Sequence, residues 1–498
     1  MIRELQTESN SNHTARYSEE ELGDLLLRSM HFYERLALLR DAAAMPSEEK
    51  HEQLLTTWSA NLGIPPSEVW ERRSEHNEFD AQAMRAVLDT TNLDPDKLET
   101  TPWLEFYKAV LDGLGTIHLD ASFFEAHRSH AFLHALIPFV ETAKKGLAKR
   151  VAGLGTSIDH FPLEGCLRFL NYSLSNLASK ALLLEFRAFK AERESAFSRF
   201  ISAEENAAPD RLYRQFIESV LTEEWHTVFG EYPVLLRQLC TSCLHWMHTV
   251  SALIERFRSD EAELAAKFNN DHPLGALKEF RFGMSDKHNG GFTTVVLEFD
   301  SGKKIVYKPK SLGTDRIVKE VAQWINSRSD LLELRTVAVI DKGDYGWQEF
   351  IEHEGCNDKA AMSEFYQRAG YWLALVYMFE GYDYHHENMI AHGAYPYLID
   401  TETIFNPFKE SEVNKDGVLS AMALASDSVL YSVIRTGMLP NWNIGAKGAK
   451  KDTSGFGGRA VEGNDQVKTR RWTGLATDDI KLTWVERPVE DMGNQPYV

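Results

Sequence analysis

The chain has 498 residues, of which 43% are hydrophobic and 26% are charged, and its formal net charge is −20. This length predicts two or three domains, because single hydrophobic cores stop growing well below it, and the ordinary composition excludes a largely disordered protein. The acidic balance argues against a nucleic-acid-binding protein, since phosphate contacts need clustered Lys and Arg. It is compatible with a cationic partner peptide, or with an anion held through a metal ion.

The sequence shows no signal for export or for stable membrane insertion. The first 16 residues, MIRELQTESNSNHTAR, lack the apolar core of a signal peptide, and no apolar run approaches the length of a transmembrane helix. The four cysteines are Cys166, Cys240, Cys243 and Cys356. Such sparse use predicts a reduced, cytoplasmic chain without a disulfide framework.

Residues 1–275 are predicted to form a helical N-terminal region. Within 19–39, apolar side chains recur three and four residues apart, which is typical of an amphipathic helix. Three further stretches share this pattern and are richer in Leu, Ala, Phe and Glu than in Val or Thr: 130–154, 167–196 and 212–268. The first half of the chain is therefore expected to be mostly α-helical.

After Pro273 the pattern changes to strands that alternate with helices. Strands are predicted at 292–299, 304–307, 336–340 and 347–351, as two hairpins, and helices at 314–327 and 365–379. This order predicts an α+β fold in which a two-lobed kinase-like domain follows the helical region. Its N-lobe is expected at 276–355 and its C-lobe at 356–498; from Lys409 onward no elements are assigned.

The segment 381–402 reads G-Y-D-Y-H-H-E-N-M-I-A-H-G-A-Y-P-Y-L-I-D-T-E and carries the most informative polar residues: Asp383, His385, Asn388, Asp400 and Glu402. Phosphoryl transfer needs a carboxylate near the attacking hydroxyl, an amide ligand for a metal ion and a further carboxylate for Mg²⁺. A hairpin would fold Asp400 back towards the Asp383 loop. Asp400 and Glu402, two residues apart on a strand, would then face one metal cluster. The alternative is a polar loop before an ordinary hairpin.

Two motifs upstream add candidate residues. Lys308, in I-V-Y-K-P-K, ends a predicted strand, where a lysine can reach nucleotide phosphates; the alternative is a solvated surface lysine. The motif D-K-H-N-G-G, with Asp286 and His288, precedes the first predicted strand. Its Asn-Gly-Gly turn would bring backbone amides close to a phosphate, although a plain loop into a strand explains it equally well.

The run C-T-S-C-L-H-W-M-H at 240–248 raises the alternative of a zinc site. All four Cys and His residues would lie on one predicted helix, with the cysteine pair and the histidine pair on different faces. No second pair of ligands follows at zinc-finger spacing. Packing of the helix is therefore the interpretation.

Together these motifs resemble a known family. D-x-H-x-x-N followed by I-D-T-E-T is similar to lipid kinases, and the fuller set resembles the N-terminal dehydratase domain of class II lanthipeptide synthetases, the LanM-type enzymes. The set lies within 283–460 and comprises D-K-H-N-G-G, I-V-Y-K-P-K-S-L, D-Y-G-W-Q-E-F-I, the segment 382–405 and T-G-M-L-P. The helical first half is compatible with the N-terminal region of that family.

The resemblance implies an ATP- and Mg²⁺-dependent enzyme that binds a precursor peptide through its leader. It would phosphorylate Ser and Thr in a core that also contains Cys, and then eliminate the phosphate to give dehydroalanine or dehydrobutyrine. Lys308 would contact the ATP phosphates, and Asp383 would orient or deprotonate the substrate hydroxyl. The implied metal ligands are Asn388, Asp400 and Glu402. The further active-site residues that it implies, with a part in phosphate handling, are His385, Asp286 and His288.

The sequence departs from the family at its end. Members continue into more of the kinase C-lobe, with a helical Arg and Thr associated with phosphate elimination, and then into a zinc-binding cyclase domain. This sequence ends at Val498, so we expect a fragment of a longer enzyme, or a chain that a partner chain completes, without cyclase activity. Two alternatives stay open: a peptide or small-molecule kinase without elimination, and a non-catalytic module that binds the leader peptide.

Overall fold

The computed structural model describes residues 18–39, 48–59, 65, 68, 81–89, 93–94, 100–193, 208–222, 225–405, 421–440, 442–444, 450–457, 466–488 and 496–497. The chain divides into two compact units. The first comprises Met1–Ile158, Leu170–Ser251 and Thr473–Lys481, and the second comprises Asp159–Phe169, Ala252–Trp472 and Leu482–Val498. In the described part of the chain, no helix is both long and apolar enough to cross a bilayer.

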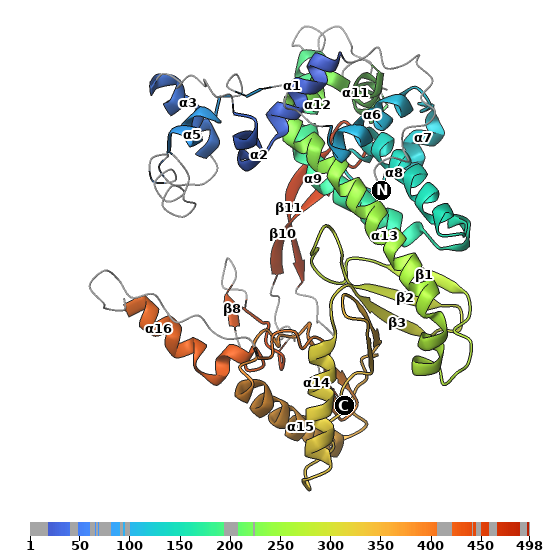
Figure 1. The fold of residues 1–498 in the computed structure, drawn as a ribbon, viewed down its shortest axis with the longest axis vertical. Coiled ribbons are helices and arrows are strands. Elements are labelled where there is room, and N and C mark those ends of the chain that lie inside the picture. The colour runs from blue at the N-terminus through green and yellow to red at the C-terminus, as the bar shows by residue number, and fades with distance from the viewer. Residues whose placement is uncertain are drawn as a thin grey trace. The chain divides into compact units, whose positions relative to one another are not determined.

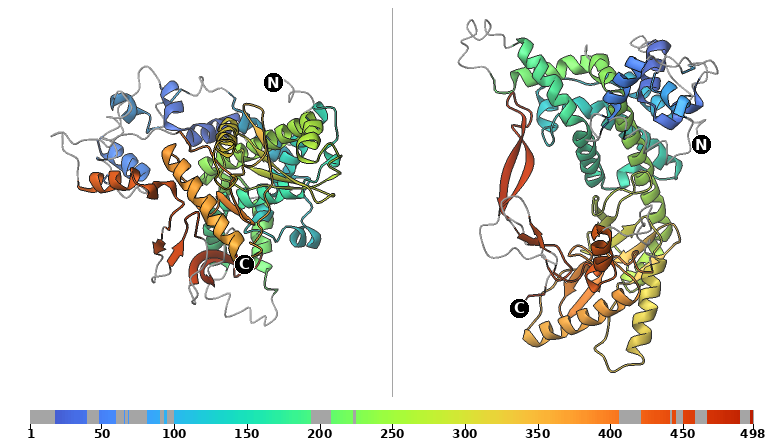
Figure 2. Two further views of the ribbon diagram at one scale, coloured as in Figure 1. Left: turned by 90° about the horizontal axis from the view of Figure 1, so that it is seen from below. Right: turned by 90° about the vertical axis from the view of Figure 1, so that its left-hand side faces the viewer.

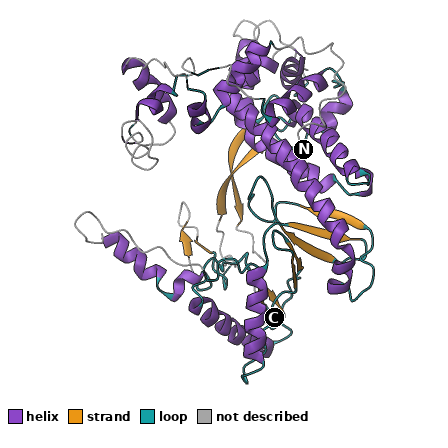
Figure 3. Ribbon diagram, viewed as in Figure 1, coloured by secondary structure: helices purple, strands orange, loops and turns teal. Residues whose placement is uncertain are grey.

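The first unit is built mainly from helices, which confirms the expected helical N-terminal region (Figures 1 and 3). Its described helices are α1 (Glu19–Ser29), α2 (Phe32–Ala37), α3 (Glu48–Ser59), α5 (Ala81–Ala86), α6 (Pro102–Leu114), α7 (Ala121–Ala126), α8 (Leu133–Gly153), α11 (Arg211–Thr222) and α12 (Trp225–Glu231). Two long helices, α9 (Glu164–Arg193) and α13 (Pro233–Phe268), have residues in both units.

The helix predicted at 19–39 is divided into α1 and α2. Met30 and His31 both adopt extended backbone, with ψ of 140° and 151°, and this ends α1. His31 then caps α2, because its Nδ1 accepts a hydrogen bond from the backbone N–H of Tyr33 at 3.3 Å. Glu34 accepts from the backbone N–H of His31 at 2.7 Å, which completes a capping box.

Aromatic side chains fill the core of the first unit. The rings of Phe186 and Phe216 are 5.3 Å apart between centroids, and Phe132 and Tyr213 pack against the same group. Cys240 and Cys243 on α13 are fully buried, and the Cys243 thiol lies 3.8 Å from the carbonyl oxygen of Phe139. This placement agrees with the packing interpretation of the Cys-His run.

A five-stranded antiparallel sheet opens the second unit, in the order β1-β2-β3-β5-β4. The strands are β1 (Leu277–Arg281), β2 (Val295–Phe299), β3 (Lys304–Lys308), β4 (Val339–Asp341) and β5 (Gly346–Glu349). Both predicted hairpins are present, whereas β1 had no counterpart in the sequence prediction. In the register, Tyr307 faces Trp347 and Lys308 faces Gly346, so Lys308 stands at the end of a central strand.

The end of α13 is fixed to this sheet by one buried carboxylate. Asp260 accepts hydrogen bonds from the indole N–H of Trp347 and the hydroxyl of Tyr345, both at 2.8 Å. The ammonium of Lys342 lies 2.9 Å from its other oxygen. These contacts lower the pKa of Asp260 although burial opposes the shift, so the carboxylate is charged and fully paired.

Besides the five-stranded sheet, the second unit contains a hydrophobic core formed by two helices and a hairpin. These elements are α14 (Gly313–Asn326), α15 (Lys359–Met378), β6 (Met389–His392) and β7 (Tyr395–Leu398). α14 and α15 run at an angle to each other (Figures 1 and 2), and they bury Val318, Phe365 and Trp372 with Met389 of the hairpin in one cluster. The hairpin is therefore held on helices as well as by its own ladder.

Further elements follow where the sequence prediction assigned none. They are α16 (Ala421–Leu430), the short helix η6 (Val433–Thr436) and the strands β8 (Trp442–Ile444), β9 (Lys450–Asp452), β10 (Gln466–Thr473) and β11 (Lys481–Pro488). β10 and β11 pair as a two-stranded ribbon, as do β8 and β9. With its helices and antiparallel sheets, the chain has the predicted α+β class.

Candidate functional site

The β6–β7 hairpin brings two candidate residues to one end. Met389 pairs with Leu398, and the N–H of Ile399 donates to the carbonyl of Asn388 at 3.1 Å. Asn388 and Ile399 therefore flank the last pair of the ladder, and Asp400 follows Ile399 directly, although Asn388 and Asp400 are twelve positions apart in the sequence. The expected return of Asp400 to the loop before β6 is present in the structure.

The loop before β6 holds Asp383 in an uncommon backbone conformation. Its φ is +69°, in the left-handed region that most residues avoid. The side chain of Asn388 donates from Nδ2 to the carbonyl oxygen of Asp383 at 2.8 Å, and His385 Nε2 lies 3.5 Å from the Asp383 carboxylate. The side chain of Asp383 remains 56% exposed, so it is accessible from solvent.

Residues from further along the chain support this loop through contacts with Tyr384. Tyr384 is fully buried, and its N–H donates to the carbonyl of Thr436 at 2.9 Å. Gly437 has φ of +75°, and a Cβ there would lie 3.1 Å from the backbone nitrogen of Tyr384. The T-G-M-L-P motif thus supports the Asp383 loop, and a side chain at Gly437 would both strain the turn and crowd that loop.

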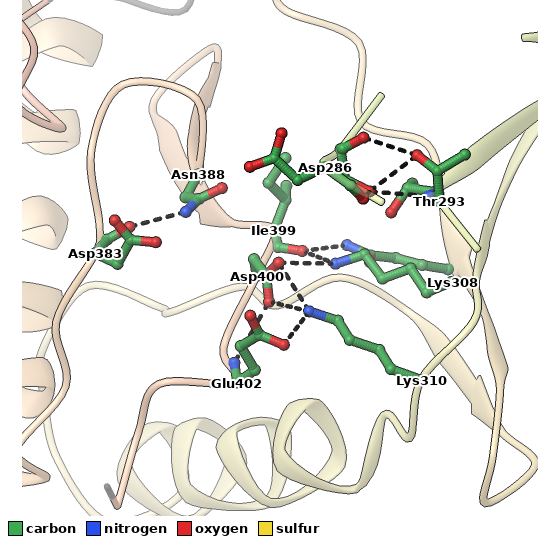
Figure 4. A network of polar contacts seen from close by, with 12 residues as sticks. Asp286, Thr293, Lys308, Lys310, Asp383, Asn388, Ile399, Asp400 and Glu402 are labelled. Carbon is green, nitrogen blue, oxygen red and sulfur yellow. Dashed lines mark hydrogen bonds and ion pairs between the residues drawn. The ribbon is translucent and has the colours of Figure 1, made fainter. Parts of the chain in front are cut away.

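Lys308 reaches the same end of the hairpin from the sheet. Its Nζ donates to the carbonyl of Ile399 at 2.5 Å and lies 4.0 Å from Asp400 Oδ2 (Figure 4). Gln348 on β5 donates to the same carbonyl at 3.1 Å. Lys308 is 5% exposed, and burial lowers its pKa against the opposing charges of Asp400 and Asp315. The predicted alternative of a solvated surface lysine is wrong.

Asp400 is bound more closely by a second lysine. The ammonium of Lys310 donates to both carboxylate oxygens of Asp400, at 2.9 and 3.0 Å, and to Glu402 Oε2 at 2.5 Å (Figure 4). Burial alone would raise the pKa of Asp400, but Lys308 and Lys310 outweigh it and lower that pKa. Asp400 and Glu402 therefore both bond the Lys310 ammonium, and they follow β7 rather than lie on it; that they face a metal ion stays a prediction.

Buried polar atoms beside this cluster lack partners. Among the described residues, Oδ1 of Asp315 and Oε1 of Gln348 are buried and make no hydrogen bond. Burial raises the pKa of Asp315, which lies in the first turn of α14. Unpaired buried groups are rare in native proteins and commonly mark a place that a ligand, ion or water completes.

Asp286 and His288 lie on the loop between β1 and β2, and both side chains are exposed. The N–H of His288 donates to the carbonyl of Phe292 at 2.8 Å. Asn289, Gly290 and Gly291 all have positive φ, so the Asn-Gly-Gly part is the tight turn that the sequence predicted. The structure thus groups Asp383, His385 and Asn388 in one loop and Lys308 with Asp400, and it places Asp286 and His288 on another loop.

The donor chemistry at the end of the hairpin suits a hard divalent cation. Mg²⁺ prefers oxygen ligands, and it commonly takes one or two carboxylates in addition to substrate phosphates. The Nδ2 atom of Asn388 donates to the carbonyl of Asp383, and the Oδ1 atom of the same amide points away from that hydrogen bond (Figure 4). Within the described ranges no group of three or more His, Cys, Asp or Glu side chains is placed to hold a metal. Asn388 and Asp400 thus carry oxygen donors of the kind that Mg²⁺ takes from a protein when it also binds phosphates.

Three residues of this cluster were absent from the sequence prediction: Lys310, Asp315 and Gln348. Lys310 is the second lysine of the K-P-K motif, so the signal for it was available. Nothing in the local pattern distinguishes Asp315 from an ordinary acidic residue in the first turn of a helix. Its importance follows only from its burial close to Lys308.

Comparisons with known proteins agree with the motif analysis. Residues 232–498, more than half of the chain, match the family described as "Domain of unknown function (DUF4135)". The chain is also similar to the lacticin 481/lactococcin biosynthesis protein LcnDR2 of Lactococcus lactis subsp. lactis, with 26% identity over 283 residues. That match covers 54% of this chain and 29% of the relative. The resemblance to class II lanthipeptide synthetases is thereby confirmed, and the chain belongs to the DUF4135 domain family.

Proposed function

We propose that the second unit is the dehydratase region of a lanthipeptide synthetase, a kinase-like domain that modifies a precursor peptide with ATP and Mg²⁺. One observation carries this proposal: Asp383 with Asn388, and Lys308 with Asp400, meet at the same end of the β6–β7 hairpin. Phosphoryl transfer depends on positioning and charge neutralisation, and these are the groups that it uses. The similarity to a lacticin biosynthesis protein supports a peptide as the substrate.

In the first step, Asp383 accepts the proton of a substrate Ser or Thr hydroxyl. The hydroxyl oxygen forms a bond to the γ-phosphorus of ATP as the bond to the bridging oxygen breaks, and ADP leaves. Lys308 would contact the phosphates, and Asn388 and Asp400, with Glu402 beside them, would hold Mg²⁺. When bound, that ion neutralises charge on the phosphates. The sheet and hairpin provide these groups already oriented, which lowers the entropic cost of alignment.

In the second step, a base removes the α-proton of the phosphorylated residue. The freed electron pair forms the Cα–Cβ double bond, the Cβ–O bond breaks, and phosphate departs with that bond's electrons. A histidine or carboxylate suits the base, and a cation stabilises the leaving phosphate. We assign the role of the base to His385, whose Nε2 lies 3.5 Å from the Asp383 carboxylate, and Asp286 and His288 are proposed to assist with the phosphate.

The alternative with the clearest support is a peptide or small-molecule kinase without elimination, because the grouped residues serve phosphoryl transfer. One experiment separates it from the dehydratase and from a non-catalytic leader-binding module. The chain is incubated with ATP, Mg²⁺ and a candidate precursor peptide, and the peptide mass is measured. Loss of water supports the dehydratase, and a stable phosphate adduct supports the kinase. An unchanged peptide that still binds supports the module, and overturns both enzyme proposals.

A further inference from the structure

Lys310 occupies the candidate metal ligands with its own charge. Its Nζ is within 3.0 Å of both oxygens of Asp400 and 2.5 Å from Glu402 Oε2. The Lys310 side chain is 31% exposed, whereas that of Lys308 is 6% exposed. The described contacts of the Lys310 ammonium are all with these two carboxylates. Lys310 is therefore a partly exposed side chain whose ammonium is held by two carboxylates.

The two lysines of the K-P-K motif are fixed in different ways. Lys308 bonds to a backbone carbonyl, that of Ile399, and sits behind it in the core. Lys310 bonds to side-chain oxygens that a divalent cation would also use. A Mg²⁺ ion bound to these oxygens, at roughly 2.0–2.1 Å, would lie close to the ammonium that bonds them. The Mg²⁺ ion and the Lys310 ammonium would then repel each other strongly, because the site is partly buried and water screens the charges only weakly.

We propose that Lys310 is a displaceable counter-ion and positioning residue, which holds Asp400 and Glu402 together without metal and moves to the nucleotide phosphates when a divalent cation takes those carboxylates. This rests on the proposed function, because it assumes that Asp400 binds the metal of the phosphoryl-transfer step. The consequence is a coupling between metal and nucleotide binding through one side chain. Such couplings typically change affinities by roughly 5- to 150-fold.

The first test measures Mn²⁺ binding to the whole chain without nucleotide, by electron paramagnetic resonance of the free ion. Lys310→Met should increase Mn²⁺ affinity by about tenfold, within the usual range of such couplings, because the competing ammonium is gone. Lys304→Met is the matched control. Lys304 lies at the other end of β3 from Lys308, and its ammonium is 2.6 Å from Glu352 rather than near Asp400. This variant should leave Mn²⁺ affinity unchanged. Asp400→Asn should abolish the binding.

The outcomes separate this inference from the proposed function. If Lys310→Met binds Mn²⁺ no more tightly than the unaltered chain, while Asp400→Asn loses the ion, then the role of Lys310 is overturned and the metal site stands. If no variant binds Mn²⁺ at millimolar concentration, the metal site is overturned, and with it this inference.

A second test isolates the movement of Lys310 to the phosphates. A fluorescent ATP analogue is titrated in EDTA, so that no metal contributes. Glu402→Gln should bind it several-fold more tightly, because it releases Lys310 from one carboxylate. In a Lys310→Met background the same substitution should give only the small gain expected from removing one negative charge. Equal gains in both backgrounds would show that Lys310 never reaches the phosphates.

Discussion

The Nζ atom of Lys308 lies 2.5 Å from the carbonyl oxygen of Ile399. This contact joins the last residue of β3 to the residue that precedes Asp400, so the five-stranded sheet and the β6–β7 hairpin share one fixed point. The backbone N–H of Ile399 in turn donates to the carbonyl of Asn388 at 3.1 Å, and this fixes Asn388 relative to Ile399. The proposed phosphate and metal groups are therefore set by backbone contacts rather than by flexible side chains alone.

Replacement of Lys308 by Met should reduce phosphorylation of the peptide by at least about 100-fold, which is the usual effect of removing one preorganised charge at a reacting centre. It should also lower the free energy of unfolding by about 3 kcal/mol, because Asp315 and Asp400 lose a buried cation. Peptide mass spectrometry and urea titration measure the two effects. Lys304→Met on the same strand is the control, and equal activity of the two variants would remove Lys308 from the site.

Replacement of Asp383 by Asn should abolish phosphorylation while the chain still folds and binds the leader peptide. Asn tolerates the left-handed backbone that this position requires, so the loop should keep its shape. The loss of the proton acceptor should cost about 100-fold or more in turnover. Turnover is followed by peptide phosphorylation, and leader binding by fluorescence anisotropy. Undiminished phosphorylation would exclude Asp383 as the base.

Replacement of Arg368 by Met should weaken the support of the hairpin turn. Arg368 is 4% exposed on α15, and its guanidinium donates to the carbonyls of Glu333 and Ala394 at 2.9 and 2.8 Å. Two partly buried hydrogen bonds from a charged donor would be lost, which should cost about 2–4 kcal/mol. Arg316→Met on α14 removes only an exposed pair with Glu320 and should change stability by less than about 0.5 kcal/mol. Urea unfolding of both variants gives the comparison, and similar losses would contradict the assignment.

The first unit should lose stability as the pH falls from 7 to 4, in part through one histidine. Burial lowers the pKa of His134 from 6.5 to about 4, and the unfolded chain therefore binds its proton at higher pH than the folded chain. The stability that neutral His134 contributes is present above pH 6.5 and is lost as the pH falls towards 4. The expected loss is about 3 kcal/mol, at roughly 1.4 kcal/mol for each unit of pKa difference.

The measurement is urea unfolding at several pH values, with His134→Gln compared with the unaltered chain. The variant should show a shallower decline of stability between pH 6.5 and 4 than the unaltered chain. His118→Gln, at an exposed position, should keep the full decline. Identical slopes for His134→Gln and the unaltered chain would show that another group controls this range.

The sequence by itself determined the elements whose signal is local. Apolar periodicity located the long helices, and alternation with turn residues located the β2–β3, β4–β5 and β6–β7 hairpins, because these patterns depend on neighbours in the chain. The motif around Asp383 and Asn388 and the family resemblance were likewise readable without coordinates. Antiparallel pairing then fixes the return of Asp400 to Asn388, since a hairpin has only one register that buries its apolar face.

Only the tertiary structure decided which charges meet. Lys308 and Ile399 are 91 residues apart in the chain, and no local pattern reveals that their contact buries the lysine. The same holds for Lys310 between Asp400 and Glu402, and for Asp315, whose significance lies in being buried near Lys308. Burial and long-range electrostatics depend on how distant segments pack, so the sequence supplied the chemical groups and the fold supplied their partners.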